Sequence, residues 1–310
     1  MLKWLVIGVG DIAVKRVIPA ILAEPRSALV GLVTRDPKRV EPYRVPAFTE
    51  LNAALKDSDA QAVYIATPVS LHEQQTVAAL RAGRDVLCEK PMGMNYAQAL
   101  AMNAVAKETG RVLGVSYYRR MYGKVERAKQ LIAAGAIGKP VIAEATSHDW
   151  FYPMNGFRAW LIDPKMAGGG PLFDIASHRI DLMNYLFGDP ERVCGRRSTL
   201  VQPIQVEDNA TVMIDYKSGV RALVDVRWHS KIARDEFRIR GTEGEMNLTP
   251  LNGPLLTYPD GVEEIPAPHN LHYPCIANFV AAVLDRAPLR SSGVSASVTD
   301  WVTEQVMTAV

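Results

Sequence analysis

The first third of the chain alternates short apolar segments with longer segments in which apolar residues recur at helical spacing. Short segments that are apolar throughout are typical of parallel strands covered by helices on both faces. We therefore predict a doubly wound α/β sheet with right-handed crossovers. The predicted strands are residues 3–8, 28–33, 62–67, 85–89 and 112–116, and predicted helices over 71–82 and 96–109 lie between them.

Beyond residue 118 the pattern changes. A helix is predicted over 124–134, a strand over 141–148, and a further helix after the glycines at 168–170. Residues 209–216, 221–229 and 236–240 alternate in polarity and are separated by short turns, which is typical of antiparallel strands. We predict two domains, 1–118 and 119–310, the second with a mixed or antiparallel sheet. Helices predicted over 273–284 and 297–309 are expected to pack back on the first domain.

Charge and cysteine content narrow the class of protein. The 310 residues include 35 basic and 33 acidic ones, spread along the chain, so a nucleic-acid partner is not expected. The three cysteines are far apart and indicate neither a disulfide framework nor a metal site. No segment reaches the ~18 apolar residues of a membrane span, and the N-terminus does not read as a signal peptide. We expect a cytoplasmic protein without a membrane partner.

A glycine-rich turn follows the first predicted strand directly. Its sequence is Gly8-Val9-Gly10-Asp11-Ile12-Ala13. Gly8 permits a tight turn, Gly10 lets the backbone approach a pyrophosphate, and Ala13 keeps the next helix close to the strand. The helix N-terminus offers free N–H groups to phosphates. An ordinary strand-to-helix turn is the alternative, but this position favours dinucleotide binding by Gly8, Gly10, Asp11, Ile12 and Ala13.

The residues after the second predicted strand bear on the choice between NAD and NADP. A carboxylate there accepts a hydrogen bond from the ribose 2′-OH of NAD, whereas an arginine accommodates the 2′-phosphate of NADP. The chain supplies both types, in the order Thr34-Arg35-Asp36. Because Arg35 comes first and Thr34 can donate a further hydrogen bond, NADP is weakly favoured over NAD. The alternative is that Arg35 and Asp36 only solvate a loop.

Lys90 follows the fourth predicted strand, in the sequence Cys88-Glu89-Lys90-Pro91. Ligands of open α/β sheets bind at the carboxyl ends of strands. A lysine there can stabilise negative charge on a substrate oxygen. By spacing alone, however, a Lys-Pro pair at a strand end is more often a solvent-facing turn.

The glycines at 168–170 and the predicted helix after them form a fourth feature. Three glycines leave the backbone bare for a close approach, and Pro171 suits the first turn of a helix. Periodicity alone favours a solvated polar face for the stripe Asp174, His178, Asp181 and Tyr185. Asp174 and His178 are nevertheless one turn apart, so the carboxylate can orient an imidazole that exchanges protons near neutral pH.

Together these features resemble the Gfo/Idh/MocA family of oxidoreductases. The similarity covers nearly the whole chain, with some likeness to the family's sugar reductases. It includes the glycine turn, the segment Ala66-Thr67-Pro68-Val69-Ser70-Leu71-His72, Glu89-Lys90-Pro91, and the Gly-Gly-Gly-x-x-x-Asp-x-x-x-His pattern that ends at His178. The resemblance implies a Rossmann domain, then an α/β domain with an open, mostly antiparallel sheet, and a substrate cleft between the domains.

The resemblance also implies roles for individual residues. Lys90 would bind the reacting oxygen, His178 would be the general acid/base, and Asp174 would position substrate and tune the histidine. Further cofactor contacts are expected from Thr67, Pro68, His72 and Glu89, and substrate contacts from Tyr118, Arg119 and Trp160. Many relatives carry a Trp-Arg pair ahead of the glycines, but here the pair is Trp160-Leu161, with Arg158 as a candidate replacement.

We therefore predict an enzyme that transfers a hydride between NADP or NAD and a hydroxyl or keto carbon of a sugar, polyol or related small molecule. Lys90, Asp174 and His178 are its predicted catalytic groups. One alternative is an NAD-dependent glycoside-cleaving or epimerising enzyme on the same scaffold, and another is a non-catalytic dinucleotide sensor. The resemblance further implies a homodimer or homotetramer.

Overall fold

The computed structural model describes residues 1–151 and 158–308, which divide into two compact units. Unit 1 contains Met1–Tyr118 and His269–Ser297. Unit 2 contains Arg119–Pro268 and the described residues after Ser297. Unit 1 therefore combines the beginning of the chain with a segment close to its end.

Unit 1 is built on a six-stranded parallel sheet in the order β3-β2-β1-β4-β5-β6. The predicted doubly wound α/β sheet is confirmed. Its strands β4 and β5 are buried along their whole length, which explains why they read as unbroken apolar segments. The strands are β1 Leu2–Ile7, β2 Ser27–Val33, β3 Ala47–Phe48, β4 Ala62–Ile65, β5 Asp85–Cys88 and β6 Leu113–Val115. The two-residue strand β3 was not predicted, because it is too short to show a period.

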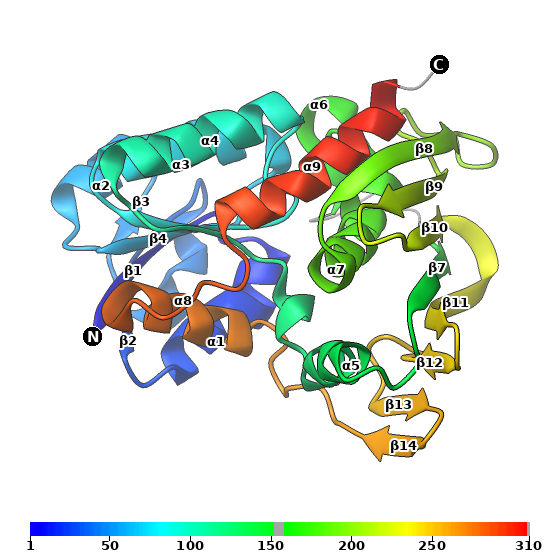
Figure 1. Ribbon diagram of the computed structural model, residues 1–310. Coiled ribbons are helices and arrows are strands. Elements are labelled where there is room, and N and C mark those ends of the chain that lie inside the picture. The colour runs from blue at the N-terminus through cyan, green and yellow to red at the C-terminus, as the bar shows by residue number, and fades with distance from the viewer. Residues whose placement is uncertain (152–157, 309–310) are drawn as a thin grey trace. The chain divides into compact units, whose positions relative to one another are not determined.

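Helices cover both faces of this sheet, with α3 and α4 on one face and α1 and α8 on the other (Figure 1). Their bounds are α1 Ile18–Ala23, α2 Leu51–Asp57, α3 His72–Arg81, α4 Tyr96–Thr109 and α8 Tyr273–Asp285. Helix α8 joins this unit through packing such as that of Phe279 on Trp4, whose ring centroids are 5.3 Å apart. Helix α9 spans Gly293–Thr308, and Ala309 of its predicted range lies outside the described residues. Within the described ranges, no helix is long and apolar enough to cross a membrane.

Unit 2 contains an eight-stranded sheet in the order β14-β13-β12-β11-β7-β10-β9-β8. Strands β7 and β10 run parallel and the other neighbours run antiparallel, so the expected mostly antiparallel sheet is confirmed. The strands are β7 Pro140–Trp150, β8 Pro190–Ser198, β9 Asn209–Tyr216, β10 Arg221–Arg227, β11 His229–Gly241, β12 Glu245–Asn247, β13 Leu255–Tyr258 and β14 Gly261–Glu264. Strand β8 and the short strands β12, β13 and β14 were not predicted.

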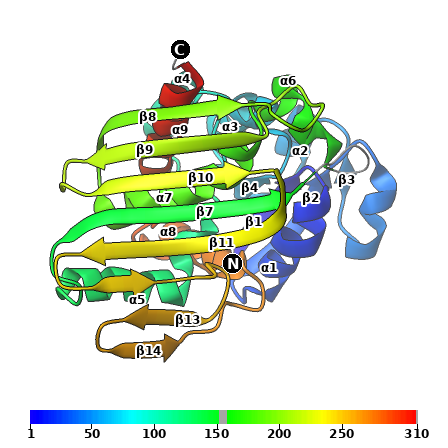
Figure 2. The same cartoon turned by 90° about the vertical axis from the view of Figure 1, so that its right-hand side faces the viewer.

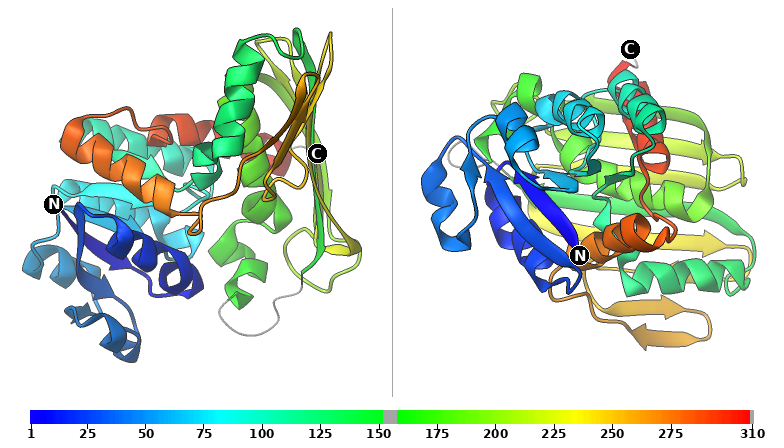
Figure 3. Two further views of the ribbon diagram at one scale, coloured as in Figure 1. Left: turned by 90° about the horizontal axis from the view of Figure 1, so that it is seen from below. Right: turned by 90° about the vertical axis from the view of Figure 1, so that its left-hand side faces the viewer.

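The helices α5, Gly123–Ala133, and α7, Ser177–Phe187, lie on the same face of this sheet (Figures 2 and 3). Alternate residues of β9 are buried, as Ala210, Val212 and Ile214 show. This two-residue period is what the alternating sequence predicts for a sheet with one covered face. A short helix, α6, spans Pro164–Ala167 and precedes the glycines at 168–170.

Candidate functional site

Three of the predicted cofactor segments follow strands that are neighbours in the sheet of unit 1. Strands β1, β4 and β5 are parallel and adjacent, about 4.8 Å apart. The glycine turn follows β1, Thr67 and Pro68 follow β4, and Glu89 and Lys90 follow β5. Because the carboxyl ends of parallel strands meet at one edge, the sheet brings these segments together in a row.

The glycine turn has room for a phosphate where the sequence predicts it. Gly8 has φ +88°, and a Cβ on it would lie 2.7 Å from the carbonyl oxygen of Ala66, so only glycine fits. Apart from the residues next to it in the chain, no described residue has an atom within 4 Å of a Cβ built on Gly10. Ala13 is fully buried, as the packing of the next helix requires. Asp11 forms an ion pair of 2.6 Å with Lys15. These residues fit a dinucleotide, whose pyrophosphate would lie against the open side of Gly10.

The loop after β2 brings a further arginine to the glycine turn. Arg39 donates a hydrogen bond of 2.9 Å to the carbonyl oxygen of Val9, and its Nε lies 3.4 Å from the Asp36 carboxylate. Arg35 is exposed, and the Oγ1 of Thr34 accepts a hydrogen bond from the Asp36 amide. Asp36 is therefore engaged within its own loop. Sequence reasoning missed Arg39, although its position shortly after Arg35 was a signal.

His72 joins the turns that follow β4 and β5. Its Nδ1 lies 2.9 Å from the carbonyl oxygen of Pro91, and its Nε2 lies 2.9 Å from that of Thr67. The side chain is only 1% exposed, and burial lowers the pKa of the imidazole. The hydroxyl of Thr67 also bonds to Gln75, with an oxygen–oxygen distance of 2.6 Å. His72 was predicted to lie along the cofactor, and its imidazole lies between the carbonyl oxygens of the two turns, to one of which a neutral ring donates a hydrogen bond.

Glu89 is the centre of a buried polar group beside Lys90. Its Oε2 accepts a hydrogen bond of 3.2 Å from the backbone N–H of Lys90, and its Oε1 accepts one from the Tyr64 hydroxyl. His272 Nε2 lies 3.3 Å from the same Oε1. Burial opposes ionisation of Glu89, but His272, Tyr64 and Lys90 outweigh it, so its pKa is lowered. The carboxylate therefore fixes the backbone from which the Lys90 side chain extends.

The predicted substrate residues Tyr118 and Arg119 belong to different units. In unit 1, the ring of Tyr118 packs on that of His272 with centroids 4.4 Å apart. In unit 2, the buried Arg119 donates a hydrogen bond to the side chain of Asn252. The next residue, Arg120, forms a buried ion pair with Asp181 of α7. Burial raises the pKa of Asp181, although Arg120 opposes this shift.

The polar stripe along α7 is not a solvated face. His178 is 5% exposed and Asp181 is 1% exposed, so the periodicity-based alternative for this stripe is wrong. Asp174 lies in a π turn, Leu172–Ala176, that leads into α7. π turns inside helices are frequent at functional sites.

Arg158 lies next to Asp174. Its Nη2 is 3.2 Å from the Asp174 carboxylate, and its guanidinium lies over the Phe151 ring at 4.4 Å from the centroid. Trp160 packs against an apolar cluster of Leu161, Val206 and Trp228. Arg158 thus places a positive charge beside Asp174. Leu161, which stands where many relatives have an arginine, has no charge to offer.

The three glycines before α7 leave the backbone bare for a close approach, as predicted, and the residue that approaches is Glu207. A Cβ on Gly170 would lie 2.0 Å from the carbonyl oxygen of Glu207, and one on Gly168 would lie 2.6 Å from the Phe173 ring. The Glu207 carboxylate accepts backbone hydrogen bonds from Gly170, at 2.7 Å, and from Leu172, at 3.1 Å. Residue 170 must therefore be glycine because its backbone packs directly against Glu207. Sequence reasoning missed Glu207, because no local pattern connects it to residue 170.

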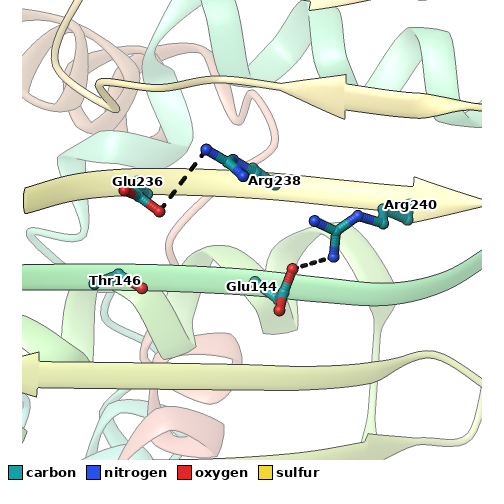
Figure 4. Close-up of a pocket in the computed structure, with 5 residues that line it drawn as sticks. All are labelled: Glu144, Thr146, Glu236, Arg238 and Arg240. Carbon is teal, nitrogen blue, oxygen red and sulfur yellow. Dashed lines mark hydrogen bonds and ion pairs between the residues drawn. The ribbon is translucent and has the colours of Figure 1, made fainter.

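A separate polar pocket lies on the sheet of unit 2. Its lining residues come from β7 and β11 and are Glu144, Thr146, Glu236, Arg238 and Arg240 (Figure 4). Arg240 forms ion pairs with Glu144 and, at 2.6 Å, with Glu245. These charges largely neutralise one another between strands, and the lining residues are not among the predicted catalytic groups.

Comparison with known proteins assigns both parts of the chain. Residues 2–117 match the family described as "Oxidoreductase family, NAD-binding Rossmann fold", and residues 125–247 match the "GFO/IDH/MocA C-terminal domain". The 1,5-anhydro-D-fructose reductase of Ensifer adhaerens is 31% identical over 91% of this chain and 88% of its own length. The dTDP-3,4-didehydro-2,6-dideoxy-alpha-D-glucose 3-reductase of Streptomyces violaceoruber is 31% identical over 90% and 84%.

A solved structure reproduces the fold. The aldose-aldose oxidoreductase from Caulobacter crescentus, complexed with glycerol, has a TM-score of 0.89 over 99% of this chain and 96% of its own, at 24% identity. At that identity the likeness establishes the fold alone.

Proposed function

The chain belongs to the Gfo/Idh/MocA family of NAD(P)-dependent oxidoreductases, and on this premise we propose that it transfers a hydride to or from a carbinol or carbonyl carbon of a sugar or polyol. The observation that carries the proposal is the buried Glu89 carboxylate, which fixes the backbone of Lys90 at the carboxyl end of β5. A lysine held in this way is suited to meet charge that develops on a reacting oxygen.

In the reducing direction, Lys90 stabilises the developing alkoxide and His178 donates the proton to it. Asp174 orients His178, and Arg158 balances the charge of Asp174. When bound, a nicotinamide cofactor would supply the hydride. The relatives at 31% identity are named as reductases of a keto sugar and of a sugar nucleotide, which favours a sugar carbonyl as substrate.

The test of this function is turnover of a panel of sugars, polyols and their keto forms, beginning with 1,5-anhydro-D-fructose. We expect Lys90→Met and His178→Asn each to lower kcat by about two orders of magnitude or more, because each removes a group that acts in the transition state. Dinucleotide binding should survive in both. Wild-type turnover in either variant would remove the role assigned to that residue.

We propose NADP as the preferred cofactor, because three basic residues, Arg35, Lys38 and Arg39, follow β2. The Asp36 carboxylate already accepts a hydrogen bond from the backbone N–H of Lys38 and forms an ion pair with Arg39. A thermal-shift titration should show greater stabilisation by NADP than by NAD at equal concentration. Arg39→Gln should narrow that difference, since it removes a positive charge beside the glycine turn. Stronger stabilisation by NAD would contradict the proposal.

The proposed reaction can be separated from its two alternatives by the absorbance of the nicotinamide. Net oxidation or reduction changes this absorbance in proportion to the product formed. A glycoside-cleaving or epimerising enzyme regenerates its cofactor in each cycle and shows no lasting change. A dinucleotide sensor shows no turnover with any substrate.

A further inference from the structure

Buried hydrogen bonds fix the loop between β12 and β13, residues 248–254. Lys124, in the first turn of α5, is only 2% exposed, and its Nζ donates hydrogen bonds of 2.8 Å to the carbonyl oxygens of Leu248 and Pro250. Within the loop, the N–H of Gly253 donates to the Pro250 carbonyl oxygen at 2.9 Å. A buried ammonium needs acceptors of this kind, because a charge away from water is costly unless it is hydrogen-bonded. Lys124 therefore holds the loop in one place.

The loop contacts Arg119 through the side chain of Asn252. Arg119 is 8% exposed, and its Nη1 donates a hydrogen bond to Oδ1 of Asn252, which is an exposed residue. The Arg119 guanidinium also lies over the Tyr122 ring, 5.9 Å from the centroid. Because a guanidinium is a planar fork of donors, a bond at Nη1 and a ring on its face together set the direction of the fork. The hydrogen bond thus joins a buried arginine to a residue that a ligand can reach.

Asp235 connects the same loop to α7. Its Oδ1 accepts a hydrogen bond of 2.8 Å from Nη2 of the buried Arg179, which directly follows His178. Its Oδ2 lies 3.5 Å from the backbone nitrogen of Asn252. The polar network that holds Arg119 therefore extends, within unit 2, to the residue next to the predicted acid/base.

We propose that Asn252 is a positioning residue for Arg119, and that it sets the direction in which this arginine meets an oxygen of the substrate. The inference rests on the proposed function and deepens it, because it assigns a determinant of substrate affinity to the loop between β12 and β13. An interaction made equally with substrate and transition state lowers KM without changing kcat. A role limited to folding would instead lower stability and leave the substrate KM of the folded protein unchanged.

The experiment compares Asn252→Leu, which removes the acceptor at nearly the same volume, with Asn252→Asp, which retains an acceptor oxygen. Asn247→Leu is the matched control. The Asn247 side chain accepts a hydrogen bond of 2.9 Å from the backbone N–H of Thr249, so its loss loosens the same loop without removing the bond to Arg119. Asn252→Leu is also made in an Arg119→Gln background, which gives a double-mutant cycle.

Two readouts separate the positioning of Arg119 from its use in the reaction. The first needs no substrate and is the rate of rotation about the Cζ–Nη1 bond of Arg119, which a hydrogen bond at Nη1 slows. It is measured by NMR on isotope-labelled arginine and assigned with Arg119→Lys. The second is kcat and KM for 1,5-anhydro-D-fructose, or for the panel member turned over fastest, together with KM for the dinucleotide.

We expect Asn252→Leu to speed this rotation and to raise the substrate KM by about fivefold or more, with kcat and the dinucleotide KM little changed, because a hydrogen bond to a charged group is lost. Asn252→Asp should lie closer to wild type, since a carboxylate accepts strongly from a guanidinium. Asn247→Leu should raise the substrate KM less. In the Arg119→Gln background, Asn252→Leu should raise it no further.

Three results would overturn the inference. They are an unchanged Arg119 rotation in Asn252→Leu, an equal rise of the substrate KM in Asn247→Leu, and a further rise in the Arg119→Gln background. If Arg119→Gln does not fold, the comparison of Asn252→Leu with Asn247→Leu decides.

The two proposals fail separately. Absence of turnover with every member of the panel, or wild-type turnover in Lys90→Met, counts against the proposed function. The Arg119 rotation would still decide whether Asn252 positions this arginine. Conversely, an inactive Lys90→Met together with an unchanged substrate KM in Asn252→Leu would leave the proposed function intact and overturn this inference.

Discussion

The two glycine-rich turns of this chain resemble each other in sequence but differ in what lies against their backbone. Each leads into a helix through a π turn, Ala13–Val17 after the first and Leu172–Ala176 after the second. Around the position where a Cβ on Gly10 would stand, no described residue other than its chain neighbours has an atom within 4 Å. Beside Gly170 that space is taken by the carbonyl oxygen of Glu207, only 2.0 Å away.

This difference separates a glycine that leaves room for a ligand from one that permits packing within the protein. At Gly10 the exposed backbone can be approached by a pyrophosphate. At Gly170 the Glu207 carboxylate already accepts the N–H groups that an anion would seek. Glycines before a helix thus indicate a backbone that can be approached closely. The residues around the turn determine whether a ligand or another part of the protein lies against it.

The largest expected effect in this comparison comes from Gly170→Ala. The added methyl group cannot avoid the backbone of Glu207, so the free energy of unfolding should fall by about 3 kcal/mol or more. Urea unfolding followed by circular dichroism measures the change. The same substitution at Gly10 serves as the matched control. A Gly170→Ala protein as stable as wild type would mean that the close approach to Glu207 is not required.

Gly10→Ala should produce a smaller effect of a different kind. Because its methyl group meets open space, stability without ligand should change by less than about 1 kcal/mol. Affinity for the dinucleotide should fall by about tenfold, or ~1.4 kcal/mol, because the methyl group obstructs the pyrophosphate. Isothermal titration calorimetry with NADP and NAD gives the dissociation constants. Unchanged affinity for both would contradict a pyrophosphate at Gly10.

Glu207→Gln should show the smallest effect, visible as a change in pH dependence. Burial raises the pKa of Glu207 above its ordinary value of 4.5, so the folded state binds this proton more tightly than the unfolded state. That contribution is complete below pH 4.5 and is lost as the pH rises through the pKa of the folded state. The glutamine keeps an acceptor for Gly170 without titrating.

The stability of the glutamine variant relative to wild type should therefore increase across this pH window and then level off. Urea unfolding at a series of pH values tests the prediction for the two proteins in parallel. Curves that keep a constant separation throughout would show that Glu207 does not titrate differently in the folded state.

Local patterns were sufficient to predict much of unit 1. Residues 62–67 and 85–89 were predicted as buried strands, and β4 and β5 occupy most of these ranges, because strands covered on both faces are apolar throughout. Strand β3 was missed because two residues carry no period. The stripe of Asp174 and His178 was found by helical spacing, but spacing cannot tell a buried polar face from a solvated one.

The sequence by itself determined the class of fold, the family and the positions of the glycine turn, Lys90 and the Asp174/His178 pair. These signals are local, because glycine requirements and hydrophobic periods act over a few neighbouring residues. Only the tertiary structure decided that Glu207 packs against the second glycine turn and that Arg39 bonds to the first glycine turn. It also decided that His272 lies beside Glu89. Such contacts join residues far apart in the chain, and they depend on how whole helices and strands pack.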